Sequence, residues 1–176
     1  MNSASREFLA TTCLNQAIDE HGNVTLEDIR RISRTVGDVE KFGNERGVCF
    51  KSTNSVATLE VDSEFPDVLS AAFVTIGPPR HTMYLPVPVC IEDIPADILD
   101  ASWSNAAFER LDKKGLGFDP SVWETSEKQV MAAFAEATEK ARAELRAGER
   151  DKAVARMRKA FLDACDVARK QVLTVE

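Results

Sequence analysis

Histidine is scarce in this chain of 176 residues, and metal-binding patterns are missing with it. Only His21 and His81 occur, and neither has a second histidine or a carboxylate at the three- or four-residue separation that a helical zinc or iron site requires. His21 is expected at the end of a helix, where a cation complements the helix dipole. The sequence therefore predicts no metal site and no cofactor.

Cysteine pairs and long apolar runs are also missing. Cys13, Cys49, Cys90 and Cys165 lie far apart without a C-x-x-C pair, which favours reduced, buried thiols over disulfides or zinc ligands. No segment approaches the roughly 18 apolar residues of a membrane span, and the N-terminal residues contain no signal-peptide core. These absences predict an intracellular, cytoplasmic protein with no membrane partner.

Excess positive charge is absent as well. With 22 basic and 29 acidic residues the formal net charge is −7 and the isoelectric point about 5.0. The basic surface that binds a nucleic acid backbone is therefore not expected. The charges of opposite sign are interspersed, which is typical of solvated helix faces. The length suffices for one compact domain with a core.

Two helices are predicted before the first strand. Residues 5–20 carry apolar side chains at helical spacing and stop before Gly22, since glycine suits the left-handed position that follows a helix. Thr25 opens a second helix, because Asp28 stands three residues further on and completes a capping box. This helix is expected to end near Gly37, before a charged loop.

Alternating and continuous apolar runs predict an antiparallel sheet. A short strand is expected at residues 48–50, and a hairpin at residues 55–61 and 69–76 with the turn at 62–67. The second hairpin strand is apolar enough to be buried on both faces. Residues 82–89 have β character but contain two prolines without N–H donors, so they are predicted to form an edge strand.

Helices are predicted for the rest of the chain. Residues 94–114 are expected to form one broken or two short helices that end at glycines, Gly115 and Gly117. Ser126 and Gln129 form a second capping-box pair, from which two helices of roughly 22 residues run as an antiparallel hairpin. Their apolar stripes contain Val130, Phe134, Ala137, Ala141 and Leu145, and Val154, Met157, Phe161, Ala164, Ala168 and Val172.

The domain prediction follows from these patterns. Residues 1–123 are assigned to an α+β domain and residues 124–176 to a helical hairpin that packs on it. Two roles remain open for the hairpin. It is either a packing tail without chemistry or an oligomerisation surface, since exposed apolar stripes favour association.

Few side chains are candidates for chemistry. The loop at residues 77–79 holds a glycine and two prolines and leads into Arg80 and His81, which makes these two side chains candidates for a pocket wall; an ordinary loop position is the alternative. Cys49 and His81 would form a nucleophile pair only if the fold brings them together. The apolar neighbours of Cys49 favour an inert thiol. Neither a G-x-S-x-G nucleophile elbow nor a phosphate-binding loop occurs.

Six short segments follow one another in a recognisable order: TLEDIRRI (25–32), VCF (48–50), TNSVATLEVD (53–62), AAFVTIGPP (71–79), MYLPVPV (83–89) and IPADI (94–98). This order resembles the C-terminal half of the N-terminal nucleophile (Ntn) hydrolases, close to their penicillin acyltransferase-like and dipeptidase-like branches. In that family a helix precedes a sheet hairpin that ends in a Gly-Pro-Pro turn, and a Tyr-x-Pro strand and a helix-rich tail follow. The resemblance covers about residues 25–123.

The resemblance implies an α+β fold in which an antiparallel sheet hairpin is covered by helices, as part of a four-layer αββα sandwich. The nucleophile of the family is a Cys, Ser or Thr that begins both the mature chain and a central strand, with its own α-amino group as base. Here the sequence opens with Met1, and Ser3 leads into a helix, so no catalytic residue is assigned. Arg80, His81 and Tyr84 are predicted to line a substrate pocket.

The leading functional prediction is therefore the C-terminal portion of a linear amide hydrolase or acyltransferase, without catalysis on its own because the nucleophile is absent. Its sheet would have unpaired edges and an uncovered apolar face, which promote association. The expected partner is a second copy of the chain, in a homo-oligomer, or a separate chain that supplies the N-terminal half. The alternative is a non-catalytic interaction or oligomerisation module.

Overall fold

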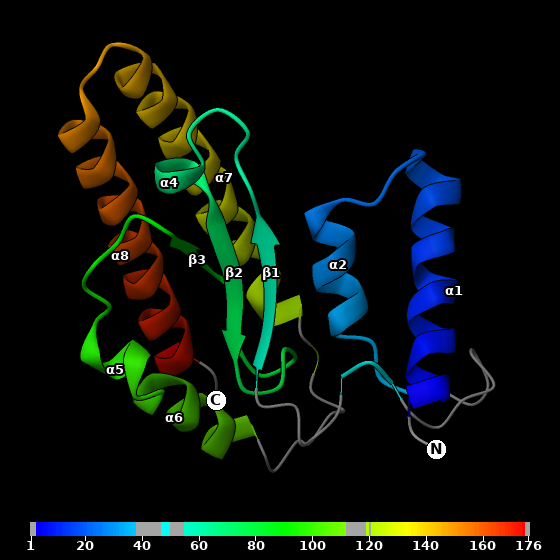
Figure 1. Cartoon of the computed structure of the whole chain (residues 1–176). Coiled ribbons are helices and arrows are strands. Elements are labelled where there is room, and N and C mark those ends of the chain that lie inside the picture. Colours follow the sequence, from blue (N-terminus) through cyan, green and yellow to red (C-terminus); the bar gives the residue numbers. More distant parts are fainter. Residues whose placement is uncertain (1–2, 38–46, 50–54, 112–118, 120, 175–176) are drawn as a thin grey trace.

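A small antiparallel sheet and a long helical hairpin form the centre of the computed structural model, with two N-terminal helices beside them (Figure 1). The structure describes residues 3–37, 47–49, 55–111, 119 and 121–174. Within these ranges the chain has a mixed α+β fold. The predicted glycine stops at Gly115 and Gly117 and the predicted strand residue Phe50 lie outside them.

The first helix follows the prediction closely. Helix α1 (Ser3–His21) is followed by Gly22, which has a φ of 76° and whose N–H donates to the carbonyl oxygen of Ile18 at 2.7 Å. The positive φ explains why glycine stands there. One side of α1 is buried: Leu9 and Cys13 pack in a cluster with Ile32 of the next helix, and Ala17 is also buried.

Helix α2 (Leu26–Ser33) begins with the predicted capping box. The Asp28 N–H donates to Thr25 Oγ1 at 3.2 Å, and the Thr25 N–H donates to Asp28 Oδ2 at 3.0 Å. The predicted end near Gly37 is wrong, because the helix stops at Ser33. Arg34 caps the C-terminal end of the helix, and its side chain reaches toward the β2–β3 loop and α7.

The strands confirm the antiparallel hairpin and its third neighbour. Strands β1 (Ser55–Glu60), β2 (Ala71–Ile76) and β3 (Leu85–Pro88) lie in the order β1-β2-β3, and each neighbouring pair is antiparallel. A short helix, α4 (Pro66–Leu69), lies in the connection between β1 and β2, and it includes Leu69, which was predicted to open the second strand. Val48 and Cys49 form a bend rather than the predicted short strand.

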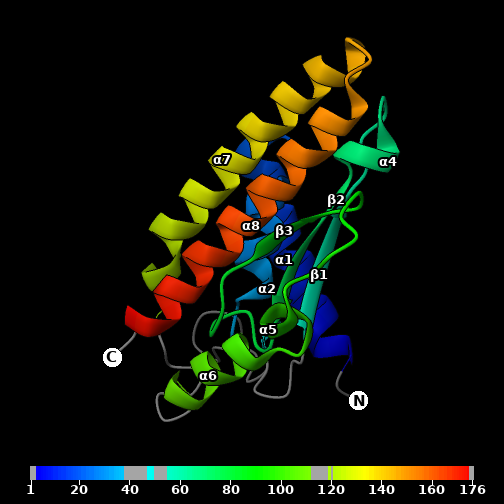
Figure 2. The ribbon, with the colours of Figure 1, turned by 90° about the vertical axis from the view of Figure 1, so that its left-hand side faces the viewer.

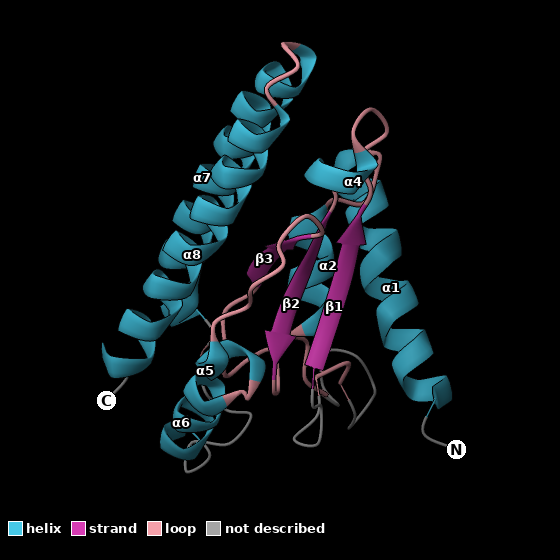
Figure 3. Ribbon diagram, turned by 60° about the vertical axis from the view of Figure 1, so that its left-hand side comes forward, coloured by secondary structure: helices cyan, strands magenta, loops and turns pink. Residues whose placement is uncertain are grey.

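The two faces of the sheet are not equally covered. Along β2, Ala71, Phe73 and Thr75 are buried, whereas the alternate residues are only half-buried, so the prediction that both faces are buried is wrong. The buried face meets the helical hairpin: the rings of Phe73 and Phe134 lie edge to face at 6.0 Å. Figures 2 and 3 show the hairpin on this side of the sheet only.

The other face, which points toward the viewer in Figure 1, is called the open face here. By strand alternation and register it carries Ala57, Leu59, Ala72, Val74, Leu85 and Val87. Leu59 is 71% exposed, and Val61 and Val89, which directly follow β1 and β3, are 74% and 53% exposed. Leu85 is buried, and Ile76 and Val87 are partly buried, in a core cluster that also contains Ile98.

Strand β3 is an edge strand, as its prolines predicted. The Val89 N–H donates to the carbonyl oxygen of Ser70, which fixes the direction of the donors along β3. Because N–H groups alternate in direction along a strand, Pro86 and Pro88 have their nitrogens on the side that faces away from β2. The outer edge of β3 therefore offers no N–H donor within the strand.

The region after the sheet contains two short helices. Helix α5 (Ala96–Leu99) and helix α6 (Ser102–Leu111) are separated at Ala101, whose φ is 61°. The prediction of broken or short helices in this region is confirmed. Both helices lie at one end of the sheet (Figure 1).

The C-terminal helical hairpin is confirmed, with a different start. Helix α7 (Ser121–Arg146) begins before the predicted Ser126, because Asp119 accepts a hydrogen bond from the Ser121 N–H at 2.9 Å and supports the first turn. The predicted domain boundary at residue 124 therefore falls inside α7. Ser126 does not cap a helix; its hydroxyl accepts a hydrogen bond from Gln171 Nε2 at 2.7 Å.

Helix α8 (Arg150–Thr174) returns along α7 after a turn at Gly148, whose φ is 78°. The apolar stripes of the two helices are buried against each other and against the sheet. Their fully or nearly fully buried members are Val130, Phe134, Ala141, Met157, Phe161, Ala164, Ala168 and Val172. The hairpin is therefore part of the core of the described fold.

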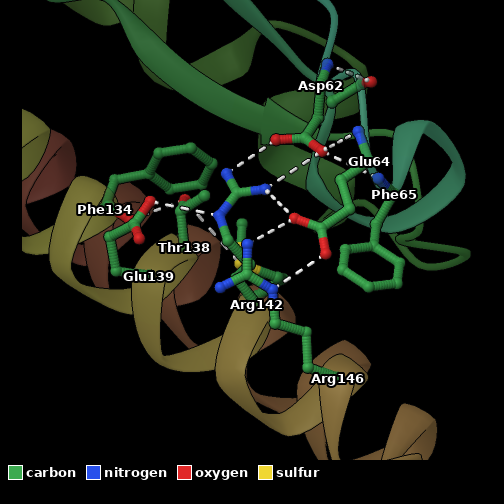
Figure 4. Close-up of polar contacts among 10 residues, drawn as sticks. Asp62, Glu64, Phe65, Phe134, Thr138, Glu139, Arg142 and Arg146 are labelled. Atoms are coloured by element: carbon green, nitrogen blue, oxygen red, sulfur yellow. Dashed lines mark hydrogen bonds and ion pairs between the residues drawn. The ribbon is translucent and has the colours of Figure 1, made fainter.

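An ionic cluster joins the β1–α4 connection to the outer half of α7 (Figure 4). It consists of Asp62, Glu64, Arg142 and Arg146 and is called the rim network here. Arg142 donates through Nη2 and Nη1 to the two oxygens of Asp62 at 2.7 and 3.2 Å, and Arg146 donates to Glu64 at 2.6 and 2.8 Å. Asp62 Oδ1 also accepts from the Phe65 N–H at 2.8 Å. The rim network fixes the connection between β1 and α4 on the side of α7.

Candidate functional site

The candidate site is a cleft of about 860 Å³ between α2, the end of α1 and the first turns of α7. Its walls are mostly charged, and acidic and basic side chains alternate around it. The lining residues are Glu20, His21, Thr25, Glu27, Asp28, Arg30, Arg31, Arg34, Thr35, Arg80, Glu124, Glu127, Lys128 and Met131. A cleft of this size has room for a small organic ligand.

A buried ion pair closes the inner end of the cleft. Arg34 Nη1 and Nη2 donate to Glu127 Oε1 and Oε2 at 3.0 and 2.7 Å, and both side chains are about 90% buried, with exposed fractions of 10% and 8%. Arg34 also donates to the carbonyl oxygens of Pro79 and Thr82, at 2.7 and 3.1 Å. One guanidinium thus holds α2, α7 and the β2–β3 loop together. This arrangement is called the Arg34 clamp here.

Tyr84 lies under the clamp. Its backbone N–H donates to Glu127 Oε2 at 2.9 Å, its hydroxyl is 2.6 Å from Ser33 Oγ, and its ring lies 5.2 Å from the Arg34 guanidinium. Burial raises the pKa of the Tyr84 hydroxyl, which the hydrogen bond with Ser33 and the Arg34 charge partly oppose. Because the side chain is fully buried, Tyr84 supports the floor of the cleft and does not line it.

Arg80 is the one predicted pocket residue that borders the cleft. Its Nη1 donates to the backbone carbonyl of Arg34 at 3.2 Å, and its own carbonyl accepts the indole N–H of Trp123 at 2.9 Å. Burial lowers the pKa of the Arg80 guanidinium, and electrostatic interactions with Cys49 and Asp119 oppose this shift. A partly desolvated positive charge therefore lies at the cleft wall.

His81, the third predicted pocket residue, is 1% exposed and does not line the cleft. Its backbone N–H donates to the carbonyl oxygen of Pro78 at 2.8 Å, which closes a turn in the β2–β3 loop. The neighbouring Thr82 is equally buried, and its Oγ1 has no hydrogen-bond partner in the described part of the chain. The loop is packed inward under the clamp.

Cys49 lies close to this loop. Its backbone N–H donates to the carbonyl oxygen of Thr35 at 2.9 Å, just after α2, and its side chain is 1% exposed. Gly47 runs so close to the same carbonyl that a Cβ at this position would collide with it. Nucleophilic pairing of Cys49 with His81 stays a hypothesis from the sequence.

The outer part of the cleft is polar and solvated. His21 stands there, half-exposed beside Glu20 at 3.6 Å, as expected for the last turn of α1. Asp28 pairs with Arg31 at 3.0 Å, and hydrogen bonds from Thr25 lower the pKa of its carboxyl group to about 2. These contacts are local ones, within α2 and its cap.

Sequence reasoning missed Arg30, Arg34 and Glu127. Arg30 and Arg34 stand four residues apart, so they project from the same side of the α2 end. Glu127 is 93 residues away from Arg34 in sequence, and its position in the long α7 pattern resembles that of any solvated helix residue. The one sequence signal for a buried Glu127 is its place on the same side of α7 as the apolar Trp123 and Val130.

The described ranges contain no group of three or more His, Cys, Asp or Glu residues placed to hold a metal ion. Likewise, none of the helices in the described part of the chain is long and apolar enough to cross a membrane. No family model, curated protein or solved structure matches the chain.

Proposed function

We propose that this chain is the C-terminal portion of a linear amide hydrolase or acyltransferase of the Ntn type, and that a partner polypeptide supplies the catalytic nucleophile. The observation that carries the proposal is the open face of the sheet. Helices α7 and α8 cover one face (Figure 2), while Leu59 on the other face remains exposed, as do Val61 and Val89, which directly follow β1 and β3. The order of the six sequence segments is the second support.

The open face fits this proposal for a physical reason. An αββα sandwich consists of two sheets that meet face to face at about 10 Å, each with helices on its outer side. A sheet with a helical layer on one face and apolar side chains on the other corresponds to one half of such a sandwich. Apolar side chains on the open face would be removed from water when the second sheet binds.

The nucleophile is assigned to the partner because the central strand β2 does not offer one. Central strand β2 begins with Ala71, and the preceding Ser70 is 6% exposed with its hydroxyl accepting the Asp62 N–H at 3.0 Å. An Ntn nucleophile must be accessible at the start of a central strand with its own amino group beside it. In this proposal the present chain contributes the sheet half and the cleft.

The first test asks whether the purified chain hydrolyses amides alone. Dipeptides and N-acyl amino acids are the substrates, and the expected result is no turnover. Cys49→Ala and His81→Ala are measured in parallel. Turnover by the unmodified chain that both substitutions abolish would establish an internal cysteine mechanism and overturn the proposal.

The second test addresses the open face. A dye that fluoresces on apolar surfaces, 8-anilinonaphthalene-1-sulfonate, is expected to bind the folded chain, and the double substitution Leu59→Ser, Val61→Ser is expected to remove most of the signal. Phe8→Ser is the control, because Phe8 is 61% exposed but lies on α1. A signal that is unchanged in the double variant, or equally reduced in the control, contradicts an accessible apolar sheet face.

The hairpin of α7 and α8 is less suited to the alternative of an interaction module. Its apolar stripes are already buried against each other and the sheet, with Phe134 on Phe73 and Trp123 fully buried. Removal of the chain after Pro120 is therefore expected to unfold the described fold, rather than release an intact domain. The structure gives the hairpin a packing role.

A further inference from the structure

The inner end of the cleft contains more positive than negative charge. Three arginines, Arg30, Arg34 and Arg80, approach the single carboxylate of Glu127 or border the same end of the cleft. The Arg34 clamp already uses both oxygens of Glu127. Tyr84 donates a further backbone hydrogen bond to Oε2. Glu127 therefore has little capacity left for another guanidinium.

Arg30 approaches Glu127 but has no hydrogen bond to it. Its Nε lies 3.7 Å from Glu127 Oε1, which is longer than a hydrogen bond, and its side chain is only 14% exposed. Within the described residues its guanidinium donates no hydrogen bond. Arginine carries five N–H donors and cannot lose its charge in a protein, so a partly buried guanidinium in this state favours an anionic ligand.

The rim of the cleft limits the charge of that ligand. Three exposed carboxylates, Glu20, Glu27 and Glu124, line the cleft with the exposed Lys128, while Arg31 is paired with Asp28. The exposed lining is therefore net negative, and it repels an anion with several charges, such as a phosphate ester, more strongly than one with a single charge. A carboxylate carries one charge, and its two oxygens match the fork of a guanidinium. The geometry thus favours a monocarboxylate over a phosphate.

We propose that the inner end of the cleft binds a small organic monocarboxylate, with Arg30 as the main donor and Arg80 as the adjacent positive charge. This inference goes beyond the proposed function, because it assigns a ligand class to the cleft whether or not the chain is part of an amide hydrolase. It assigns Arg30 a binding role, and it assigns the Arg34 clamp the role of fixing α2 so that Arg30 faces the cleft.

The experiment measures binding by the purified full chain, without any turnover. N-acetyl-L-phenylalanine, its neutral amide and inorganic phosphate are titrated separately while the indole N–H signal of Trp123 is followed by NMR. This group donates to the Arg80 carbonyl and so reports on the cleft wall. Trp103→Phe identifies the signal, because the chain has only two tryptophans. A saturable shift is expected with the carboxylate and a far weaker one with the amide.

Two substitutions locate the site. Arg30→Gln is expected to weaken carboxylate binding at least tenfold, and Arg30→Lys is expected to restore part of it. Arg158→Gln is the control, because it removes the same net charge from an exposed site. Arg158 lies on α8, is 52% exposed and pairs with Asp93. Its binding is expected to stay within twofold of that of the unmodified chain. Thermal unfolding of each variant shows whether it is folded.

Three outcomes overturn the inference: no saturable shift with the carboxylate, equal binding of the neutral amide, or equal loss in Arg30→Gln and Arg158→Gln. Tighter binding of phosphate than of the carboxylate would also overturn it, in favour of a phosphate site. Failure here is distinguishable from failure of the proposed function, because the dye test probes the open face and the amidase test probes catalysis. Neither depends on Arg30.

Discussion

Two arginine–carboxylate clusters hold α7 in place, and they differ in their surroundings. The Arg34 clamp at the inner end of the cleft is about 90% buried and includes two backbone carbonyls. The rim network at the other half of the helix is more solvated: Glu64 and Arg146 have exposed side-chain fractions of 39% and 61%, and Asp62 and Arg142 of 12% and 19%. The comparison shows that the same pair of residue types contributes differently according to whether water can replace a lost partner.

The largest effect is expected when the clamp loses its carboxylate. Glu127→Gln leaves the Arg34 charge buried without compensation and weakens the acceptor of the Tyr84 N–H, which is expected to cost about 3–5 kcal/mol of unfolding free energy. Urea unfolding followed by circular dichroism measures it. Glu124→Gln, three residues earlier on the same helix and exposed, is the matched control. Equal losses in the two variants would remove the distinction between the clamp and the helix surface.

A smaller, pH-dependent effect is expected in the rim network. Hydrogen bonds from Arg142 lower the pKa of the Asp62 carboxyl group from 3.8 to about 2, although burial opposes this shift. A lowered folded-state pKa contributes stability that is present above pH 3.8 and is lost as the pH falls toward about 2. Asp62→Asn is therefore expected to cost about 1–3 kcal/mol at pH 7, as charged hydrogen bonds do.

The pH dependence of that variant's stability shows how much of the Asp62 contribution comes from its charge. The stability difference between Asp62→Asn and the unmodified chain is expected to shrink as the pH is lowered through the interval from 3.8 to about 2. Asp93→Asn is the control, because Asp93 is 78% exposed and pairs only with Arg158 in the described structure. A difference that stays constant over this interval would show that Asp62 stabilises through shape rather than charge.

The smallest effect is expected on the solvated side of α7. Glu136 and Lys140 form an exposed pair four residues apart, and hydrogen bonding by Lys140 lowers the pKa of the Glu136 carboxyl group. Because solvent screens such pairs, Glu136→Gln is expected to leave the midpoint of thermal unfolding unchanged within error. A midpoint shift as large as that of Asp62→Asn would contradict the claim that exposure to water weakens such an ion pair.

Local chemistry made part of the fold predictable. The capping box of Thr25 and Asp28, the turn at Gly22 and the edge position of β3 each depend on a few neighbouring residues, and all are present. The apolar stripes of α7 and α8 predicted a hairpin for the same reason. These features do not depend on what lies across the core.

Features that depend on distant residues were not predictable. Helix α2 ends at Ser33, and the next residue, Arg34, pairs with Glu127, a partner that no local pattern contains. The apolar run of β2 predicted burial on both faces, but only one face has a helical layer. Of the predicted pocket residues, Arg80 borders the cleft, while His81 and Tyr84 are packed beneath it. The sequence predicted which segment lies at the cleft, but not which of its side chains point into the cleft.

The two prolines of β3 have a consequence for how this protein can aggregate. A cross-β filament grows by adding strands at both sides of a sheet, and each addition needs backbone donors on the growing side. With Pro86 and Pro88 turned outward, one side of the sheet is a dead end for such growth. Strand addition is thereby limited to the β1 side. Two molecules can pair there, but the pair then exposes only β3 edges, which cannot accept a third.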